Sequence, residues 1–155
     1  MTGRMVVGYD GSDDSRVALS WAVAMARKWT VDLVAVSCWV PPMAPGLPQL
    51  PPDYLAAMEE HTTAALSNAL HECGAYAEGL DVDVRVIQSP AADALLEEAK
   101  DADMLVVGSH GGGGRGRMRL GGVARECVLY ATCPVVIVRP DATWTAPGGA
   151  QGPGG

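Results

Sequence analysis

Short apolar runs alternate with amphipathic stretches along most of the chain. Five runs carry little or no charge and predict β-strands at residues 5–9, 31–40, 82–87, 104–107 and 134–138. Between them, apolar residues recur at helical spacing and predict helices at residues 15–29, 53–79, 91–100 and 123–131. Strict alternation of strand and helix predicts an α/β fold: a doubly wound, five-stranded parallel sheet with helices on both faces, in a single domain.

Local signals indicate where the helices begin. Ser12, or one of the two aspartates after it, can cap the first helix, and Asp53 is placed to cap the second. Ser89 followed by Pro90 predicts the start of the third helix, since serine caps and proline fits the first helical position. Six prolines between residues 41 and 52 predict an extended loop ahead of the second helix.

One loop carries most of the candidate chemistry. Six glycines and three arginines lie between Gly108 and Arg119, directly after the predicted strand 104–107 and before a predicted helix. Glycines let the backbone approach an anion, loop and helix amides donate to it, and arginines neutralise it. In a parallel sheet this loop lies on the same edge as the loop after the first strand, Asp10 to Ser12, where ligands bind. A phosphate site formed by both loops is therefore predicted.

Composition narrows the possible partners. The chain has 155 residues and a net charge of −7, which argues against general binding to nucleic acid or to an anionic membrane. No apolar run approaches the ~18–20 residues that span a bilayer, and no signal peptide is recognised, so a cytoplasmic location is expected. Residues 141–155 are rich in glycine and proline, and we expect a disordered tail after a domain at residues 1–140.

The four cysteines predict no metal site. They form no C-x-x-C pair, and Cys127 and Cys133 are too far apart for zinc-finger spacing. Buried, reduced thiols are the expected state. His110 is not expected to be a general base, and no catalytic residue is predicted.

Two segments resemble the universal stress protein family. GYDGSDDSRVALSWAVAMA, at residues 8–26, is similar to the start of its members, and VVGSHGGGGRGRMRLGGVARECVLYATCPVVIVRP, at residues 106–140, is similar to their end. The family's nucleotide motif is Gly, two residues, Gly, nine residues, Gly, then Ser or Thr. Gly108, Gly111 and Gly121 keep this spacing, but Gly122 stands where the family has the hydroxyl.

The resemblance implies a nucleotide across the two loops. Asp10 would face the ribose or adenine, Cys38 would border the adenine, and the motif glycines would wrap the ribose and phosphates. The loss of a hydroxyl at Gly122 removes a contact to phosphate, worth about 1.5–3 kcal/mol. The expected nucleotide-binding residues are Asp10, Gly11, Ser12, Cys38, Ser89, Pro90, Gly108, Ser109, His110, Gly111, Arg115, Arg117, Arg119, Gly121, Gly122 and Val123.

These observations predict an adenine-nucleotide-binding stress-response sensor or regulator, with ATP as ligand, with or without Mg²⁺. A homodimer through the strand from Pro134 to Val138 is expected, because this apolar strand needs cover. The alternative is a nucleotide-independent dimeric scaffold or partner-binding protein, which Gly122 favours. As an enzyme, the chain would support at most slow ATP hydrolysis.

Overall fold

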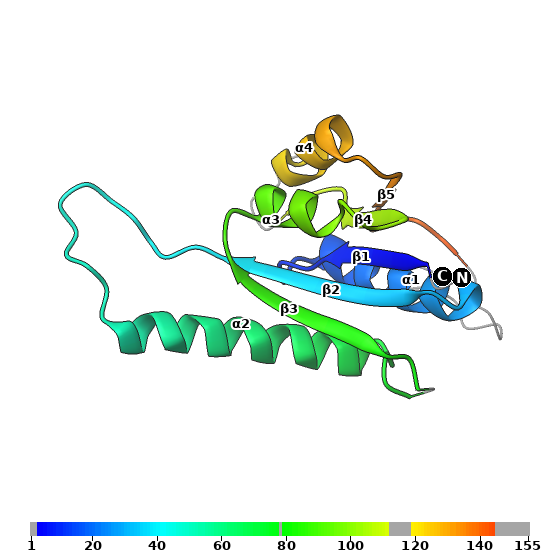
Figure 1. The fold of residues 1–155 in the computed structure, drawn as a ribbon, viewed down its shortest axis with the longest axis horizontal. Coiled ribbons are helices and arrows are strands. Elements are labelled where there is room, and N and C mark those ends of the chain that lie inside the picture. The colour runs from blue at the N-terminus through cyan, green and yellow to red at the C-terminus, as the bar shows by residue number, and fades with distance from the viewer. Residues whose placement is uncertain (1–2, 78, 112–118, 145–155) are drawn as a thin grey trace.

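The computed structural model describes residues 3–77, 79–111 and 119–144 and shows nine alternating elements (Figure 1). The elements are β1 (Arg4–Gly8), α1 (Asp13–Trp29), β2 (Asp32–Trp39), α2 (Pro52–Glu72), β3 (Val82–Gln88), α3 (Ala91–Glu98), β4 (Met104–Gly108), α4 (Gly122–Tyr130) and β5 (Val135–Val138). The strands form one parallel sheet in the order β3-β2-β1-β4-β5. The predicted fold class is confirmed.

The central strands are apolar because helices cover both of their faces. Val6 of β1 pairs with Val34 of β2 and with Leu105 of β4, and all three side chains are buried. β3, by contrast, alternates exposed and half-buried positions, as the alternation in its sequence predicts for a strand at the sheet edge.

Two hydrophobic cores lie on opposite faces of the sheet. One contains side chains of α1 and α2, including Leu19, Leu66 and Leu70, and the other contains Leu95 of α3 with Cys127 of α4. α2 reaches well beyond β2 and β3, toward the proline-rich loop that projects from the body (Figure 1). The sheet is thus the middle layer of three, and its carboxyl edge remains free for loops.

The start of α1 agrees with its sequence. Ser12 is the N-cap, and its hydroxyl accepts a hydrogen bond from the Ser15 amide over 3.2 Å. The helix ends in an unusual way, because Thr30 has a left-handed backbone with φ of 54°. A β-branched residue is strained in this conformation.

The second helix is shorter than predicted. It ends at Glu72 rather than at residue 79, because Gly74 turns left-handed with φ of 73°. The Gly74 amide bonds to the His71 carbonyl over 3.1 Å and the Ala75 amide to the Leu70 carbonyl over 2.9 Å. Both bonds are those of a Schellman motif, which closes a helix around a glycine.

Two of the predicted caps are wrong. Pro51 occupies the N-cap of α2 and Pro52 starts the helix, so Asp53 lies in the first turn instead of capping it. At α3 the N-cap is Pro90 rather than Ser89, whose hydroxyl donates to the Pro90 carbonyl over 3.1 Å. In both places the fixed φ of proline prepares the backbone for the helix without a side-chain cap.

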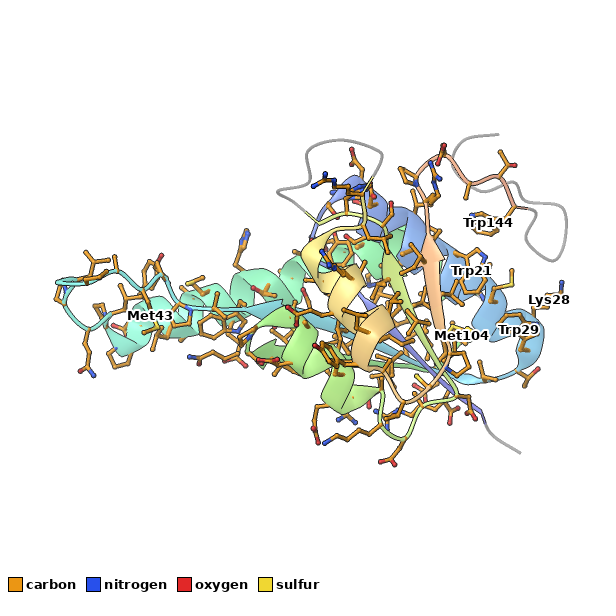
Figure 2. All side chains as sticks on the ribbon, turned by 90° about the horizontal axis from the view of Figure 1, so that it is seen from above. Trp21, Lys28, Trp29, Met43, Met104 and Trp144 are labelled. Atoms are coloured by element: carbon orange, nitrogen blue, oxygen red, sulfur yellow. The ribbon has the colours of Figure 1, made fainter. Side chains whose placement is uncertain are left out.

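The C-terminal segment packs on the body as far as the structure describes it. Trp144 is half-buried against the core that contains α1. Figure 2 shows it on the same side of the molecule as Trp21 and Trp29, whose rings meet edge to face with centroids 5.9 Å apart, and far from Met43 of the proline-rich loop. The disorder predicted for the rest of the tail concerns residues 145–155, which lie outside the described residues.

Candidate functional site

The strand order reverses between β1 and β4, and the loops after these two strands meet at that point. A pocket opens there, with a cavity of about 70 Å³, several times the roughly 10–15 Å³ that one water needs. Its lining comes from the ends of β1, β2 and β4, the first turns of α1, α3 and α4, and the adjoining loops. The lining residues are Gly8, Tyr9, Asp10, Ser15, Val36, Cys38, Ala91, Leu95, Val107, Gly108, His110, Gly111, Val123 and Ala124.

Close packing requires glycine at the end of β4. A Cβ on Gly108 would lie 2.8 Å from the carbonyl carbon of Asp14, which is backbone and cannot turn aside. A Cβ on Gly111 would lie 2.8 Å from Oδ2 of Asp10. These two glycines therefore bring the chain after β4 against the loop after β1 and leave main-chain atoms in the pocket wall.

Asp10 organises the loop after β1. Its Oδ1 accepts hydrogen bonds from the amide of Ser12, over 2.9 Å, and from the Ser12 hydroxyl. Gly11, between them, has φ of 84°, a conformation that favours glycine. The Asp10 amide in turn donates to Ser15 Oγ over 3.2 Å. The carboxylate thus holds a tight turn and also lines the pocket.

Helix α4 begins at the pocket. Its N-cap is Gly121, which has no side chain to cap it, and the first backbone bond of the helix runs from the Arg125 amide to the Gly121 carbonyl over 2.9 Å. The amides of Gly122, Val123 and Ala124 precede this bond and have no partner within the helix. Val123 and Ala124 line the pocket, so the positive end of the helix dipole faces it.

The opposite wall is apolar. Val36, Leu95 and Val107 are buried there, and Cys38 is half-buried beside them. Burial, and secondarily the charge of Glu98, raises the pKa of the Cys38 thiol to about 11. The thiol is therefore protonated at neutral pH and acts as a small apolar contact. A flat, apolar ligand group fits this wall, with an anionic group toward α4.

Comparison with known proteins identifies a family for this chain. The model of the universal stress protein family matches residues 1–139. The chain belongs to this family.

Among curated universal stress proteins, one from Mycolicibacterium smegmatis is 39% identical over 141 residues, which cover 88% of this chain and 45% of the relative. Universal stress proteins of Mycobacterium tuberculosis match over a similar share of their length. This universal stress protein chain thus spans about half the length of the curated relatives it matches.

Solved structures share the fold. A universal stress protein from Lactobacillus plantarum matches with a TM-score of 0.73 at 19% identity, covering 88% of this chain and 97% of that one. A universal stress protein in complex with cAMP matches with a TM-score of 0.64 at 27% identity over 90% and 98%. A family member from Arabidopsis thaliana with AMP bound matches with a TM-score of 0.57 at 21% identity over 88% and 91%.

The structure brings together part of the predicted set. Six predicted residues line the pocket: Asp10, Cys38, Gly108, His110, Gly111 and Val123. Seven others lie close to a lining residue in the sequence but are not in the wall. Gly11, Pro90, Ser109 and Gly122 are direct neighbours of a lining residue, and Ser12, Ser89 and Gly121 lie one residue further away. Arg119 is exposed and does not line the pocket. Arg115 and Arg117 lie outside the described residues.

Sequence reasoning missed the apolar wall and one carboxylate. The pattern assigned Tyr9, Val36 and Leu95 only to the core. Tyr9 directly follows β1 at the carboxyl edge of the sheet, which was a usable signal, whereas Val36 lies within β2 and Leu95 within α3. Asp14 was predicted as a possible helix cap and, with Asp10 and Asp13, as a weak magnesium candidate, but not as a link between the two loops. Its Oδ2 accepts hydrogen bonds from the Ser109 hydroxyl over 2.7 Å and the His110 amide over 2.9 Å.

Within residues 3–77, 79–111 and 119–144, no three His, Cys, Asp or Glu side chains gather in a way that would hold a metal ion. Over the same described ranges, no helix is long and apolar enough to cross a bilayer.

Proposed function

We propose that this universal stress protein binds an adenine nucleotide across the loops after β1 and β4 and acts as a cytoplasmic stress-response sensor or regulator. The pocket at the reversal of strand order supports this proposal most directly. It joins an apolar wall that suits a base to open main-chain amides of α4 that suit a phosphate. The structural neighbours described with cAMP and AMP are consistent with the same ligand class.

ATP, with or without Mg²⁺, is the ligand we propose first. Gly108 and Gly111 pack so closely on Asp14 and Asp10 that neither has room for a Cβ, and we propose that their bare backbone faces the ribose and phosphates. Asp10 lines the pocket, and Asp14 lies behind Ser109 and His110; both carboxylates already accept hydrogen bonds. We therefore propose nucleotide binding, with at most slow hydrolysis, rather than dedicated catalysis.

Calorimetric titration of the full chain with ATP, ADP, AMP and cAMP, each with and without Mg²⁺, tests the proposal. Denaturing the purified protein and identifying any released nucleotide by mass spectrometry gives an independent answer. Gly108→Ala is the loss-of-binding variant, since its Cβ would lie 2.8 Å from the Asp14 carbonyl carbon and would force the two loops apart. Absence of heat and of competition at millimolar ATP would reject nucleotide binding.

Self-association is the second part of the proposal. β5 is an edge strand, and the end of α4 beside it leaves Val128, Leu129 and Tyr130 exposed by 51%, 62% and 68%. In the part of the chain that the structure describes, β5 pairs on one side only, and such a strand edge next to an apolar helix end is a surface that a second copy can cover. We propose a homodimer through residues 134–138 with the end of α4 against the partner.

Light scattering at micromolar concentration tests the dimer. Leu129→Glu should shift the mass to that of a monomer, because it places a charge in the proposed interface. Lys28→Glu, an exposed change near the end of α1 (Figure 2), should leave the mass unchanged. A monomeric wild-type protein would contradict this part of the proposal.

One observation favours the alternative, a dimeric scaffold that needs no nucleotide. Gly122 lacks the hydroxyl that the motif of the family places at the phosphates, while the apolar surface of α4 is present. A dimer that binds no nucleotide in the titrations above would support the scaffold.

A further inference from the structure

The carboxylate of Asp14 joins the two loops that form the pocket. It lies in the first turn of α1, and its Oδ2 accepts hydrogen bonds from two groups just beyond β4, the Ser109 hydroxyl at 2.7 Å and the His110 amide at 2.9 Å. His110 Nδ1 lies 3.2 Å from the same oxygen. This third contact is a hydrogen bond in the tautomer of His110 that carries its hydrogen on Nδ1.

Ser109 extends this connection to the start of α4. Its carbonyl accepts a hydrogen bond from the Gly121 amide over 2.7 Å, and Gly121 is the N-cap of that helix. Gly121 also packs so closely on this segment that a Cβ there would lie 3.1 Å from the His110 Cα. Asp14, Ser109 and Gly121 therefore fix the first turn of α1, the end of β4 and the first turn of α4 relative to one another.

Asp14 does this from outside the pocket. It is absent from the pocket lining, and its side chain is only 16% exposed. His110, which does line the pocket, depends on this carboxylate for its orientation, because among the described residues its Nε2 is buried without a hydrogen-bond partner. The carboxylate and the Ser109 hydroxyl are thus the polar contacts that hold the imidazole.

We propose that Asp14 is a positioning residue for the phosphate end of the ligand site. It holds Gly108 to Gly111 and the open amides of α4 in the arrangement that a phosphate needs, without touching the ligand. This inference rests on the proposed nucleotide binding and concerns one end of that site. The Asp14 carboxylate bonds to Ser109 and His110, whereas Val36, Leu95 and Val107 of the apolar wall are held by hydrophobic packing.

Three variants of the full chain test the role of Asp14 by titration with AMP and with adenosine. Asp14→Ala removes every contact of the carboxylate and should weaken AMP about tenfold, the loss expected from one charge-assisted hydrogen bond. Adenosine, which has no phosphate, should bind Asp14→Ala as it binds the wild type. Asp14→Asn keeps an acceptor oxygen and should restore most of the AMP affinity. Asp13→Ala, an exposed neighbour of equal charge, is the matched control and should change neither ligand.

Amide exchange measured by NMR separates a loosened loop from a destabilised fold. In Asp14→Ala the His110 amide should exchange faster than in Asp13→Ala, while the Val106 amide within β4 should exchange at the same rate in both. Exchange that accelerates in β4 as well would indicate global destabilisation. In that case the AMP titration of Asp14→Asn decides: recovery of the AMP affinity supports the positioning role, and no recovery rejects it.

The outcomes are distinct. If the wild type binds neither AMP nor adenosine, the proposed function is rejected and this inference falls with it. If the wild type binds AMP and Asp14→Ala binds it equally well, or if AMP and adenosine weaken by the same factor, the positioning role alone is rejected.

Discussion

Restoring the hydroxyl at residue 122 is the most informative single change in the site. Gly122 is the first residue of α4, and a Cβ built on it would meet no atom of the described residues within 4 Å, so a serine side chain fits among them. If the hydroxyl donates to a phosphate, the added hydrogen bond to a charged group contributes about 1.5–3 kcal/mol. The dissociation constant for ATP or AMP should therefore fall by about one to two powers of ten.

The control for Gly122→Ser is Gly122→Ala, which adds the Cβ without the hydroxyl. Both variants replace a helical glycine, so both should resist thermal unfolding better than the wild type, by up to about 1 kcal/mol for alanine. Only serine should tighten the nucleotide, and adenosine should be unaffected by either. Calorimetry with ATP, AMP and adenosine measures the affinities. Equal nucleotide affinity in the serine and alanine variants would refute the reasoning, because the helix start would then lie away from the phosphates.

Three other changes follow from the structure. Gly108→Ala should destabilise the fold by about 1–3 kcal/mol, as overpacking does, because the new Cβ meets the Asp14 backbone at 2.8 Å. The same change should abolish nucleotide binding. A melting temperature and a nucleotide affinity equal to those of the wild type would contradict this prediction. Thr30→Gly should raise the stability by about 1 kcal/mol in urea denaturation, since it relieves a left-handed β-branched residue; no gain would mean that Thr30 is not strained. The pKa of Cys38 is raised from 9.0 to about 11, so its contribution to stability is full below about pH 9 and is lost as the pH rises through 11. Urea denaturation at pH 8 and 10.5 should therefore show a smaller alkaline loss in Cys38→Ser than in the wild type, and equal losses would exclude burial of the thiol as the cause.

The order and type of the elements were predictable because the apolar residues of each segment follow one pattern, either the short continuous or alternating run of a strand or the spaced stripe of a helix. The five strands and four helices lie where the pattern of the chain predicts them, with ends that differ by one to a few residues. The largest error, at the end of α2, came from local backbone chemistry: Gly74 closes the helix although the sequence remains compatible with a helix beyond it.

The site was predictable only as far as motifs and sheet topology reach. Because parallel strands end at one edge, the loops after β1 and β4 had to meet, and Asp10, Gly108 and Gly111 were found together. Leu95 could not be assigned to the pocket, since its burial looks the same as that of a core residue. Asp14 is a different case: its contact with Ser109 spans 95 residues of sequence, and no local pattern reports such a pair.

Helix α4 links the two proposed activities. Its first turn lies at the pocket, through Val123 and Ala124, and its last turn carries the exposed Val128 to Tyr130 beside β5. A helix of nine residues is roughly 14 Å long at 1.5 Å per residue, so any phosphate-induced shift of its start would be carried as a rigid body to its end. Nucleotide binding and self-association then share one rigid element, and linkage requires that each affects the other by the same factor. A regulator and a dimeric scaffold are in that case two states of one molecule, and the scaffold stands alone only if the wild-type pocket binds no nucleotide.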